Sequence, residues 1–453
     1  MFRDTLLAAA LASLVAPMAW AAVGADEAKQ LGVTLTAVGA EKAGNKEGTI
    51  PEYTGGLTTP PPGFQKDSGF RPDPFASEKP RLTITGKDVA AHADKLTEGT
   101  KELLKRYPTM RVDVYPTHRT VALPKFVVDN TVKNATVAKA IDGGLATQGV
   151  LPGFPFPIPK TGYEVMWNHL LAYKGLGFYA QFDSINVNAA GVPRLATYGD
   201  ATYEWPNYDP KKTGFIKETD PFWNVKIDYL GPPRRKGEAL LVQDSANPLK
   251  QARRAWQYLP GQRRVKAAPE VAYDEPNAVW AGAAAYSDAE IFNGAMDRFD
   301  FKLLGKKEMY VPYNAYRLAY EKTTANITKP KHINPDLVRW ELHRVWVVEA
   351  RLKPDKHDIY SKRVFYVDED SWLALASDEY DGEGQLYRSA FAFLSQSYDV
   401  PAPWFDTQAY YDFSSRLYNV TGLVGGYSGI KYLNERKPES FWSPEALAGA
   451  GSR

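Results

Sequence analysis

Residues 341–352 read ELHRVWVVEARL, and this stretch decides the fold class. It is rich in β-branched and aromatic residues, and its two faces alternate in character, so it predicts a long β-strand. The residues 353–355 (KPD) that follow are typical of a turn. Three further strands, predicted at 361–368, 372–380 and 385–393, are joined by equally short connectors rich in Asp and Gly. Such short connections indicate an antiparallel meander, because parallel strands need a long crossover.

The same alternation extends toward the N-terminus and predicts a mainly β (α+β) fold with a few helices. The earlier strands are predicted at 178–183, 194–205, 238–244, 253–259 and 262–267. Helices are predicted at 97–107, 131–145 and 162–174, where apolar residues recur with helical spacing. Residues 152–159 (PGFPFPIP) predict a stiff extended linker, because each proline fixes φ and removes a donor. The helices are available to cover one face of the sheet.

The start of the chain predicts export. Leu6 to Met18 form an apolar run, and Ala19 and Ala21 are the small residues that a signal peptidase inspects, so cleavage is expected after Ala21. The alternative is a membrane anchor, but the run is shorter than the about 20 residues that a spanning helix needs and contains Pro17. We therefore expect a signal peptide at 1–21 and a periplasmic location.

The remaining chain is expected to hold an arm and one large domain. Residues 22–96 predict an extended N-terminal arm and irregular lead-in, since they are rich in Gly and Pro with no periodic apolar face. Residues 97–453 are expected to form a single domain. The chain has no cysteine, which excludes disulfides, thiolate catalysis, Cys-ligated metals and a lipid-modified N-terminal Cys.

Composition excludes one class of partner and leaves others open. Lys plus Arg number 55 and Asp plus Glu 53, so the basic excess typical of a nucleic-acid-binding protein is missing, and no nucleic-acid partner is expected. The chain has 27 Tyr, 20 Phe and 11 Trp. These aromatic residues fit a thick β core, an apolar ligand cavity or a surface that stacks on sugars.

No motif in the sequence predicts catalysis or a cofactor. Dinucleotide, phosphate-loop, nucleophile-elbow and zinc-protease motifs do not occur, and the six histidines lack metal-ligand spacing. Acidic clusters stand at 368–370 and 378–383, with Asp297 and Asp300 as a further pair. The first two lie at or beside predicted hairpin turns, where Asp is expected for backbone reasons. We predict no catalytic residue, no metal and no cofactor.

One charge interrupts the predicted strand 341–352. Its even positions share a face that reads Leu, Arg, Trp, Val, Ala, Leu, with Arg344 as the single charge. A charge in a dry core is costly unless it is paired. Arg344 therefore pairs with a carboxylate or extends to water, or else the face lines a partly wet cavity where Arg344 holds a lid or an anionic head group.

Seven longer motifs together carry a resemblance to a known family. They are 114–119 (VYPTHR), 167–171 (WNHLL), 254–265 (RAWQYLPGQRRV), 292–295 (FNGA), 306–314 (KKEMYVPYN), 339–346 (RWELHRVW) and 362–372 (KRVFYVDEDSW). On these motifs the chain resembles the domain of unknown function 1329 family of Gram-negative bacteria over nearly all of its mature length. That family is distantly similar to the Lol-type carriers that sort outer-membrane lipoproteins.

The resemblance implies an architecture and a set of partners. The implied fold is a strongly curved antiparallel sheet, an open half-barrel, whose concave apolar face is covered by helices and receives acyl chains. The implied partners are a lipid or other hydrophobic ligand, an exporter of the resistance-nodulation-division class and an outer-membrane β-barrel protein. No catalytic residue is carried over by the resemblance.

Three functional hypotheses follow from these observations. The first is a periplasmic carrier or accessory protein for lipids or other hydrophobic molecules, acting between an inner-membrane exporter and the outer membrane. From the strand pattern we predict its ligand-binding residues as Trp256, Tyr258, Arg344, Trp346, Val348, Phe365 and Phe391. The second is a carbohydrate-active enzyme or sugar-binding protein that uses paired carboxylates and aromatic platforms. The third is a structural adaptor without a cavity.

Overall fold

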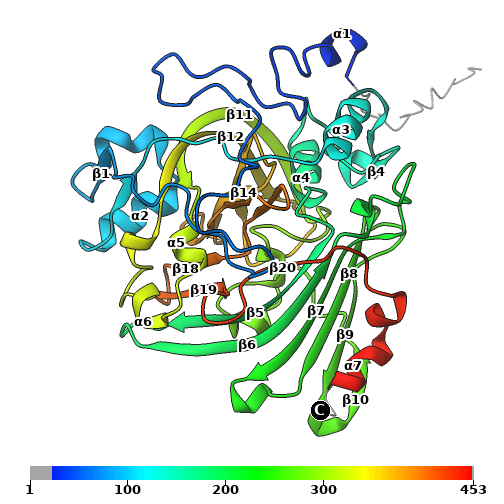
Figure 1. The fold of residues 1–453 in the computed structure, drawn as a ribbon. Helices are drawn as coiled ribbons and strands as arrows, with labels where there is room; N and C mark the ends of the chain where they lie inside the picture. Colours follow the sequence, from blue (N-terminus) through cyan, green and yellow to red (C-terminus); the bar gives the residue numbers. More distant parts are fainter. Residues whose placement is uncertain (1–22, 451–453) are drawn as a thin grey trace, which may run out of the picture.

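The computed structural model describes residues 23–450, so the predicted signal peptide and its cleavage site lie outside the described residues. This part of the chain is mostly β, with 32% strand and 19% helix. Figure 1 shows a broad sheet that bends through the whole molecule, with short helices at its margins. No helix of residues 23–450 combines the length and the apolar character that crossing a membrane requires.

The strands of the described region fall in three sheets. In chain order they are β1 (Leu82–Ile84), β2 (Val112–Val114), β3 (Lys139–Ile141), β4 (Ala146–Gln148), β5 (Gly177–Val187), β6 (Pro193–Glu204), β7 (Pro221–Gly231), β8 (Ala239–Ser245), β9 (Arg254–Leu259), β10 (Arg264–Ala267), β11 (Phe299–Pro312), β12 (Trp340–Leu352), β13 (Lys362–Asp368), β14 (Ala374–Tyr380), β15 (Leu386–Ala392), β16 (Ser395–Ser397), β17 (Ala402–Trp404), β18 (Gln408–Asp412), β19 (Leu417–Leu423) and β20 (Lys431–Tyr432).

The helices are short. The α-helices are α1 (Ala25–Ala28), α2 (Glu98–Arg106), α3 (Lys125–Val137), α4 (Gly162–Leu170), α5 (Tyr316–Ala319), α6 (Thr324–Ile327) and α7 (Pro444–Ala450). The 3₁₀ helices are η1 (Val89–Lys95), η2 (Asp142–Gly144), η3 (Pro206–Tyr208), η4 (Pro233–Arg235), η5 (Pro260–Gln262), η6 (Ala278–Trp280), η7 (Tyr286–Asp288), η8 (Pro335–Leu337) and η9 (Glu439–Trp442).

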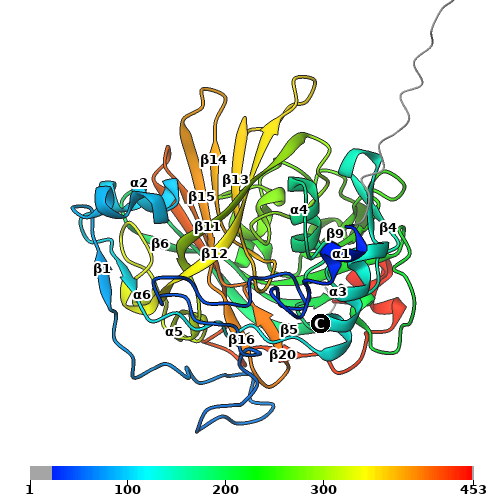
Figure 2. The same ribbon diagram turned by 90° about the horizontal axis from the view of Figure 1, so that it is seen from above.

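The large sheet is an antiparallel meander that is not closed into a barrel. From one side to the other its main strands run β11-β12-β13-β14-β15-β18-β19-β5-β6-β7-β8-β9-β10. Every pair along this path is antiparallel, and the exception in the sheet is the parallel contact of β2 with β12. β10 and β11 are the two ends of the path, and the 31 residues 268–298 connect them. Figure 2 shows β11 to β15 side by side.

Most of the predicted strands are confirmed, and the predicted helices are confirmed in part. The helix predicted at 97–107 is α2, whose first turn is capped by the side chain of Thr97. The helix predicted at 162–174 ends at Leu170, four residues early. The helix predicted at 131–145 is wrong in its second half, because 139–148 pair as the β3–β4 hairpin across the Gly143-Gly144 turn. The predicted linker 152–159 is largely buried.

The concave interior of the sheet contains the connection between its two ends, which we call the inner segment (residues 268–298). Thr197 of β6 donates a hydrogen bond to the carbonyl of Val279 at 2.7 Å. On the opposite wall Tyr410 of β18 donates to the carbonyl of Asp288 at 2.9 Å. Because the inner segment bonds to both walls, it fills much of the space that a bare half-barrel would leave open.

The other face of the sheet is covered by separate pieces of the chain. α2 packs against β14 and β15. α7 packs against β8, β9 and β10 (Figure 1), and Trp442 of η9 joins the same cluster. On the inner side α4 lies against β11 and β12. The predicted covering of the concave face by helices stays a prediction, since the inner segment contributes much of that filling.

Candidate ligand cavity

A cavity lies between the concave face of β5–β8 and the inner segment. The volume that the centre of a water molecule can occupy in it is about 70 Å³. Its walls are formed by Phe182, Tyr203, Trp223, Val225, Ile227, Leu240, Val242, Arg253, Val271, Asn277, Val279, Trp280, Tyr286, Ala289, Glu290, Asp406, Gln408 and Thr421. Eleven of these eighteen residues are Val, Ile, Leu, Phe, Tyr or Trp, so the cavity is predominantly apolar.

Strand pairing explains why the wall is apolar. Val225 of β7 stands opposite Val242 of β8, and Ile227 opposite Leu240. These residues alternate along each strand, so all four point to the same face of the sheet. Since the sheet is curved and this is its inner face, their side chains converge on the cavity. Leu241, between two of them, points outward and packs against Trp442 and Leu447.

One end of the cavity carries charge. Glu290 of the inner segment accepts a hydrogen bond from Lys174 Nζ at 2.7 Å and another from Trp223 Nε1 at 3.1 Å. Lys174 also lies 4.9 Å from the ring centroid of Trp205, which favours its positive charge. Both oxygens of Glu290 are therefore engaged inside the protein.

Asp406, just before β18, is the second acidic residue of this end. Among the described residues, no hydrogen bond or ion pair to its carboxylate is present, and Asp406 is partly buried in the cavity wall. Burial, and next the charge of Glu290, raise the pKa of Asp406 to about 7 against the opposing charge of Lys174. Gly422 allows this placement: a Cβ there would lie 2.1 Å from the carbonyl oxygen of Asp406.

Arg253 separates this cavity from a second, wider one. Its guanidinium binds both oxygens of Asp244 at 2.8 and 2.6 Å and the side chain of Asn293 at 2.5 Å. The second cavity has about 260 Å³ open to the centre of a water molecule, and Trp167 and Leu170 of α4 contribute to its wall. The two cavities lie on either side of one fully paired arginine.

The structure brings together four of the seven predicted ligand-binding residues. Arg344, Trp346 and Val348 alternate on β12, and Phe365 of β13 stands opposite Val348. Val348 and Phe365 are completely buried, and Phe365 packs edge-to-face on Phe292 of the inner segment at 5.4 Å. These four residues face the interior of the sheet but contact protein side chains, and they line neither cavity.

The other three predicted residues lie elsewhere. Trp256 and Tyr258 of β9 stand opposite Leu241 and Ala239, so they belong to the outward cluster with Trp442. Phe391 packs against Trp340 and Tyr411, at 5.8 and 6.0 Å between ring centroids. None of the three lines either cavity.

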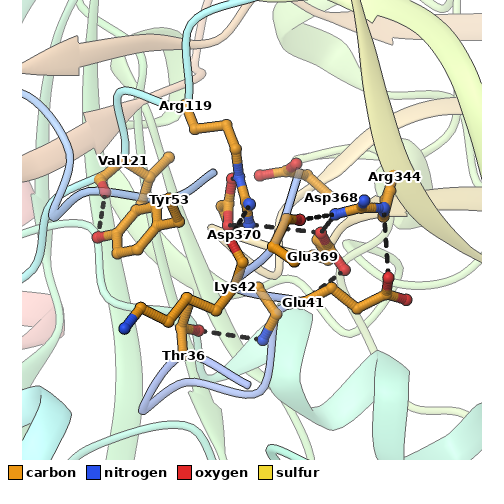
Figure 3. A network of polar contacts seen from close by, with 12 residues as sticks. Thr36, Glu41, Lys42, Tyr53, Arg119, Val121, Arg344, Asp368, Glu369 and Asp370 are labelled. Atoms are coloured by element: carbon orange, nitrogen blue, oxygen red, sulfur yellow. Dashed lines mark hydrogen bonds and ion pairs between the residues drawn. The ribbon is translucent and has the colours of Figure 1, made fainter. Parts of the chain in front are cut away.

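Arg344 pairs with carboxylates and holds the N-terminal arm. It lies 3.4 Å from Glu369 and from Glu41 of the arm, and it donates to the carbonyl of Ala43 at 3.0 Å (Figure 3). Burial raises the pKa of Glu41, but the charges of Lys306 and Arg344 outweigh it and hold the pKa below its ordinary value. Arg344 thus anchors a segment of this chain, in agreement with the paired-carboxylate interpretation.

One group of described residues has the spacing of a metal site. Ligand atoms of His343, Asp368 and Asp370 lie within 4.8 Å of one another. Both oxygens of Asp370, however, accept hydrogen bonds from Arg119, at 2.6 and 2.8 Å (Figure 3). Burial, and next the charge of Asp370, raise the pKa of Asp368 to about 6. Since Arg119 already supplies positive charge to the group, we assign no metal to it.

The acidic clusters that the sequence places at turns differ in their roles. Asp381 accepts the backbone N–H groups of Glu383 and Gln385, which confirms turn chemistry there. Asp378 instead lies within β14 and is fully buried, and it accepts the backbone N–H groups of Glu98 and Gly99 at 2.9 and 2.8 Å. The prediction of a turn role for Asp378 is therefore wrong, because this carboxylate caps the start of α2 from another part of the chain.

Sequence reasoning missed the polar residues of the cavity. Asp406 stands beside buried aromatic residues in 404–408 (WFDTQ), and Glu290 stands in an irregular segment without periodicity. One signal was present: a lone acidic residue inside an aromatic run requires a buried partner or a cavity. The residues that face Asp406 across the cavity are more than 100 residues away from it in sequence.

Comparisons with known proteins agree with the resemblance found in the sequence. The model of the family described as "Protein of unknown function (DUF1329)" matches residues 83–448. An uncharacterized protein of Pseudomonas aeruginosa is 42% identical over 446 residues, which cover 97% of each chain.

Three solved structures are similar at low identity. One, from Vibrio parahaemolyticus, is described as an outer membrane lipoprotein-sorting protein domain; it is 18% identical, covers 60% of this chain and 91% of its own, and has a TM-score of 0.40. A DUF1329 family protein from Desulfovibrio piger is 16% identical, covers 60% of this chain and 92% of its own, and has a TM-score of 0.40. A LolA superfamily protein from Nitrosomonas europaea is 12% identical, covers 64% of this chain and 100% of its own, and has a TM-score of 0.38. At these TM-scores the likenesses support no functional conclusion.

Proposed function

The chain belongs to the DUF1329 family, and we propose that it binds and carries a lipid or another hydrophobic molecule in the periplasm. The observation that carries this proposal is the apolar cavity between the concave sheet face and the inner segment. Burying an alkyl chain there is worth about 0.8 kcal/mol for each CH₂ group. A short chain therefore gains several kcal/mol without any covalent chemistry.

The inner segment determines how large the ligand is. In this structure the first cavity has a volume of about 70 Å³ and the second a volume of about 260 Å³. A longer acyl chain needs space that the inner segment now fills. We propose that such a ligand displaces part of this segment, which is joined to the sheet through its two ends and through individual hydrogen bonds.

Binding of a fluorescent apolar probe tests the proposal. N-phenyl-1-naphthylamine should bind the purified chain with enhanced emission, and Val242→Phe should weaken that binding by filling the cavity. Val192→Phe is the matched control, because Val192 is 43% exposed and does not belong to the cavity wall. Unchanged binding in Val242→Phe, or equal loss in both variants, would contradict the proposal. Mass spectrometry of natively purified protein should also detect copurified lipid.

The transport route is part of the proposal. Export rests on the predicted signal peptide, and the partners are an exporter of the resistance-nodulation-division class and an outer-membrane β-barrel protein. Crosslinking in intact cells, followed by identification of the captured membrane proteins, tests this route. Capture of neither kind of protein would remove the exporter-to-outer-membrane role and leave ligand binding to be judged separately.

A sugar-active enzyme is the second candidate function. Asp406 and Glu290 share the cavity with aromatic rings, and glycosidases use a carboxyl group with raised pKa together with a second carboxyl group. Lys174 and Trp223 already occupy both oxygens of Glu290, which favours the carrier. Hydrolysis of chromogenic glycosides that is lost in Asp406→Asn would establish the enzyme instead.

A further inference from the structure

The charges around the first cavity are balanced except for one. Lys174 and Glu290 form an ion pair at 2.7 Å, and both side chains are buried. Arg253 and Asp244 form another at 2.6 Å. Asp406 is the remaining charged residue of the wall, and within residues 23–450 no cation lies within ion-pair distance of it. The cavity therefore contains one carboxylate more than its own cations neutralise.

The two cations near the cavity are already occupied by protein groups. Lys174 is held by Glu290 and by the rings of Trp205 and Phe405, with its Nζ 4.9 and 5.3 Å from their centroids. Arg253 makes a bidentate pair with Asp244 and a further bond to Asn293. Neither is available for an anionic ligand, and a ligand carboxylate or phosphate placed here would be repelled by Asp406 and Glu290.

Neutral polar residues belong to the same wall as Asp406. They are Gln408 of β18, Thr421 of β19 and Asn277 of the inner segment. Beyond this polar end the wall consists of Val225, Ile227 and further apolar side chains. The cavity thus has an acidic end and an apolar body.

We propose that the cavity selects an amphiphile whose apolar chain ends in an ammonium group, with Asp406 as the acceptor of that group. This inference rests on the proposed function and names the ligand class of the same site. An ammonium ion offers three donors and one positive charge, so it satisfies the unpartnered carboxylate and restores charge balance. The same chemistry is present in a free alkylamine and in the head group of an aminophospholipid.

A series of three ligands with one chain length tests the inference. Octylamine, octanol and octanoate are titrated into the full mature chain by isothermal calorimetry at pH 7.5. We expect octylamine to bind about tenfold or more tightly than octanol, as a charge-assisted hydrogen bond implies, and octanoate to bind most weakly. Asp406→Asn should remove the advantage of octylamine and leave octanol binding unchanged. Asp300→Asn is the control, since Asp300 is 71% exposed and outside the cavity.

Each result distinguishes the ligand class from the carrier function. Equal affinities for all three ligands, or a preference for octanoate, overturn the inference while the carrier proposal stands. Failure of all three to bind contradicts the carrier proposal itself. The wild-type series decides the head-group preference even if Asp406→Asn does not fold. Transfer from vesicles of phosphatidylethanolamine, compared with phosphatidylglycerol, then separates a lipid source of the ammonium group from a free amine.

Discussion

The substitution Asp406→Asn gives a prediction for stability that needs no ligand. Asn has nearly the shape of the protonated Asp side chain but does not ionise. In the folded chain the carboxyl faces an apolar cavity, with Glu290 as a nearby negative charge and Lys174 as the opposing positive one. We therefore expect the variant to escape a cost that the wild-type chain bears at high pH.

The magnitude follows from the two pKa values. The pKa of Asp406 is raised from its ordinary value of 3.8 to about 7 in the folded chain. The folded state therefore binds the proton more tightly than the unfolded state. The stabilisation from this group is complete below pH 3.8 and is lost as the pH rises from 3.8 through 7. At about 1.4 kcal/mol for each pH unit, the loss is on the order of 4 kcal/mol.

Urea unfolding of wild type and variant at pH 5, 7 and 9 measures this difference. At pH 5 the variant should already be the more stable protein by about 1.6 kcal/mol, because the unfolded wild-type carboxyl is ionised there while the folded one keeps its proton. At pH 9 Asp406→Asn should be more stable by about 4 kcal/mol. The comparison isolates Asp406, since other buried carboxyl groups are common to both proteins.

Two outcomes would refute the reasoning. If Asp406→Asn is less stable by the same amount at all three pH values, Asp406 acts as an ordinary hydrogen-bonding residue and its carboxylate has a partner. If the stability advantage of the variant is larger at pH 5 than at pH 9, the sign of the pKa change is wrong. The exposed control Asp300→Asn should leave the difference between pH 5 and pH 9 unaltered.

Three further predictions concern the contacts that hold the interior together. Arg363→Ala should destabilise the chain by about 3 to 5 kcal/mol in urea unfolding, because it removes the cation nearest to buried Asp288 and Glu379. Arg351→Ala, at an exposed ion pair, should cost less than about 1 kcal/mol. Trp280→Ala should cost about 3 to 5 kcal/mol and let the cavity bind larger apolar probes, as calorimetry would show. Arg344→Ala should loosen the N-terminal arm around Glu41, seen as faster hydrogen exchange in 36–53 with unchanged exchange in β7.

The strands of the meander are predictable because each carries its own signal. Alternation and short Asp- and Gly-rich turns lie within about ten residues, so the stretches that became β12, β13, β14 and β15 are found from local pattern alone. Strand β11 is missed because it contains Gly305, exposed Leu304 and several lysines, and its pairing with β12 includes a bulge. The second half of the helix predicted at 131–145 fails because hairpin pairing overrides helical spacing there.

The predicted site residues show where local pattern ends. Arg344, Trp346, Val348 and Phe365 share the inner face, as their alternation implies, yet the inner segment and the N-terminal arm already cover them. Trp256 and Tyr258 alternate equally well but face outward. A strand pattern identifies the two faces of a strand. It does not show which face is concave, or which other part of the chain packs against it.

The sequence by itself therefore determined the family, the antiparallel meander and the predicted export signal, because these depend on local periodicity and on contiguous motifs. Only the tertiary structure decided that residues 268–298 fill the interior, and that Asp406 and Glu290 meet at one end of a cavity lined by β7 and β8. The physical reason is that the curvature of the sheet brings together groups more than 100 residues apart. Their burial and shared charge, rather than their neighbours in sequence, set the electrostatic character of this end of the cavity.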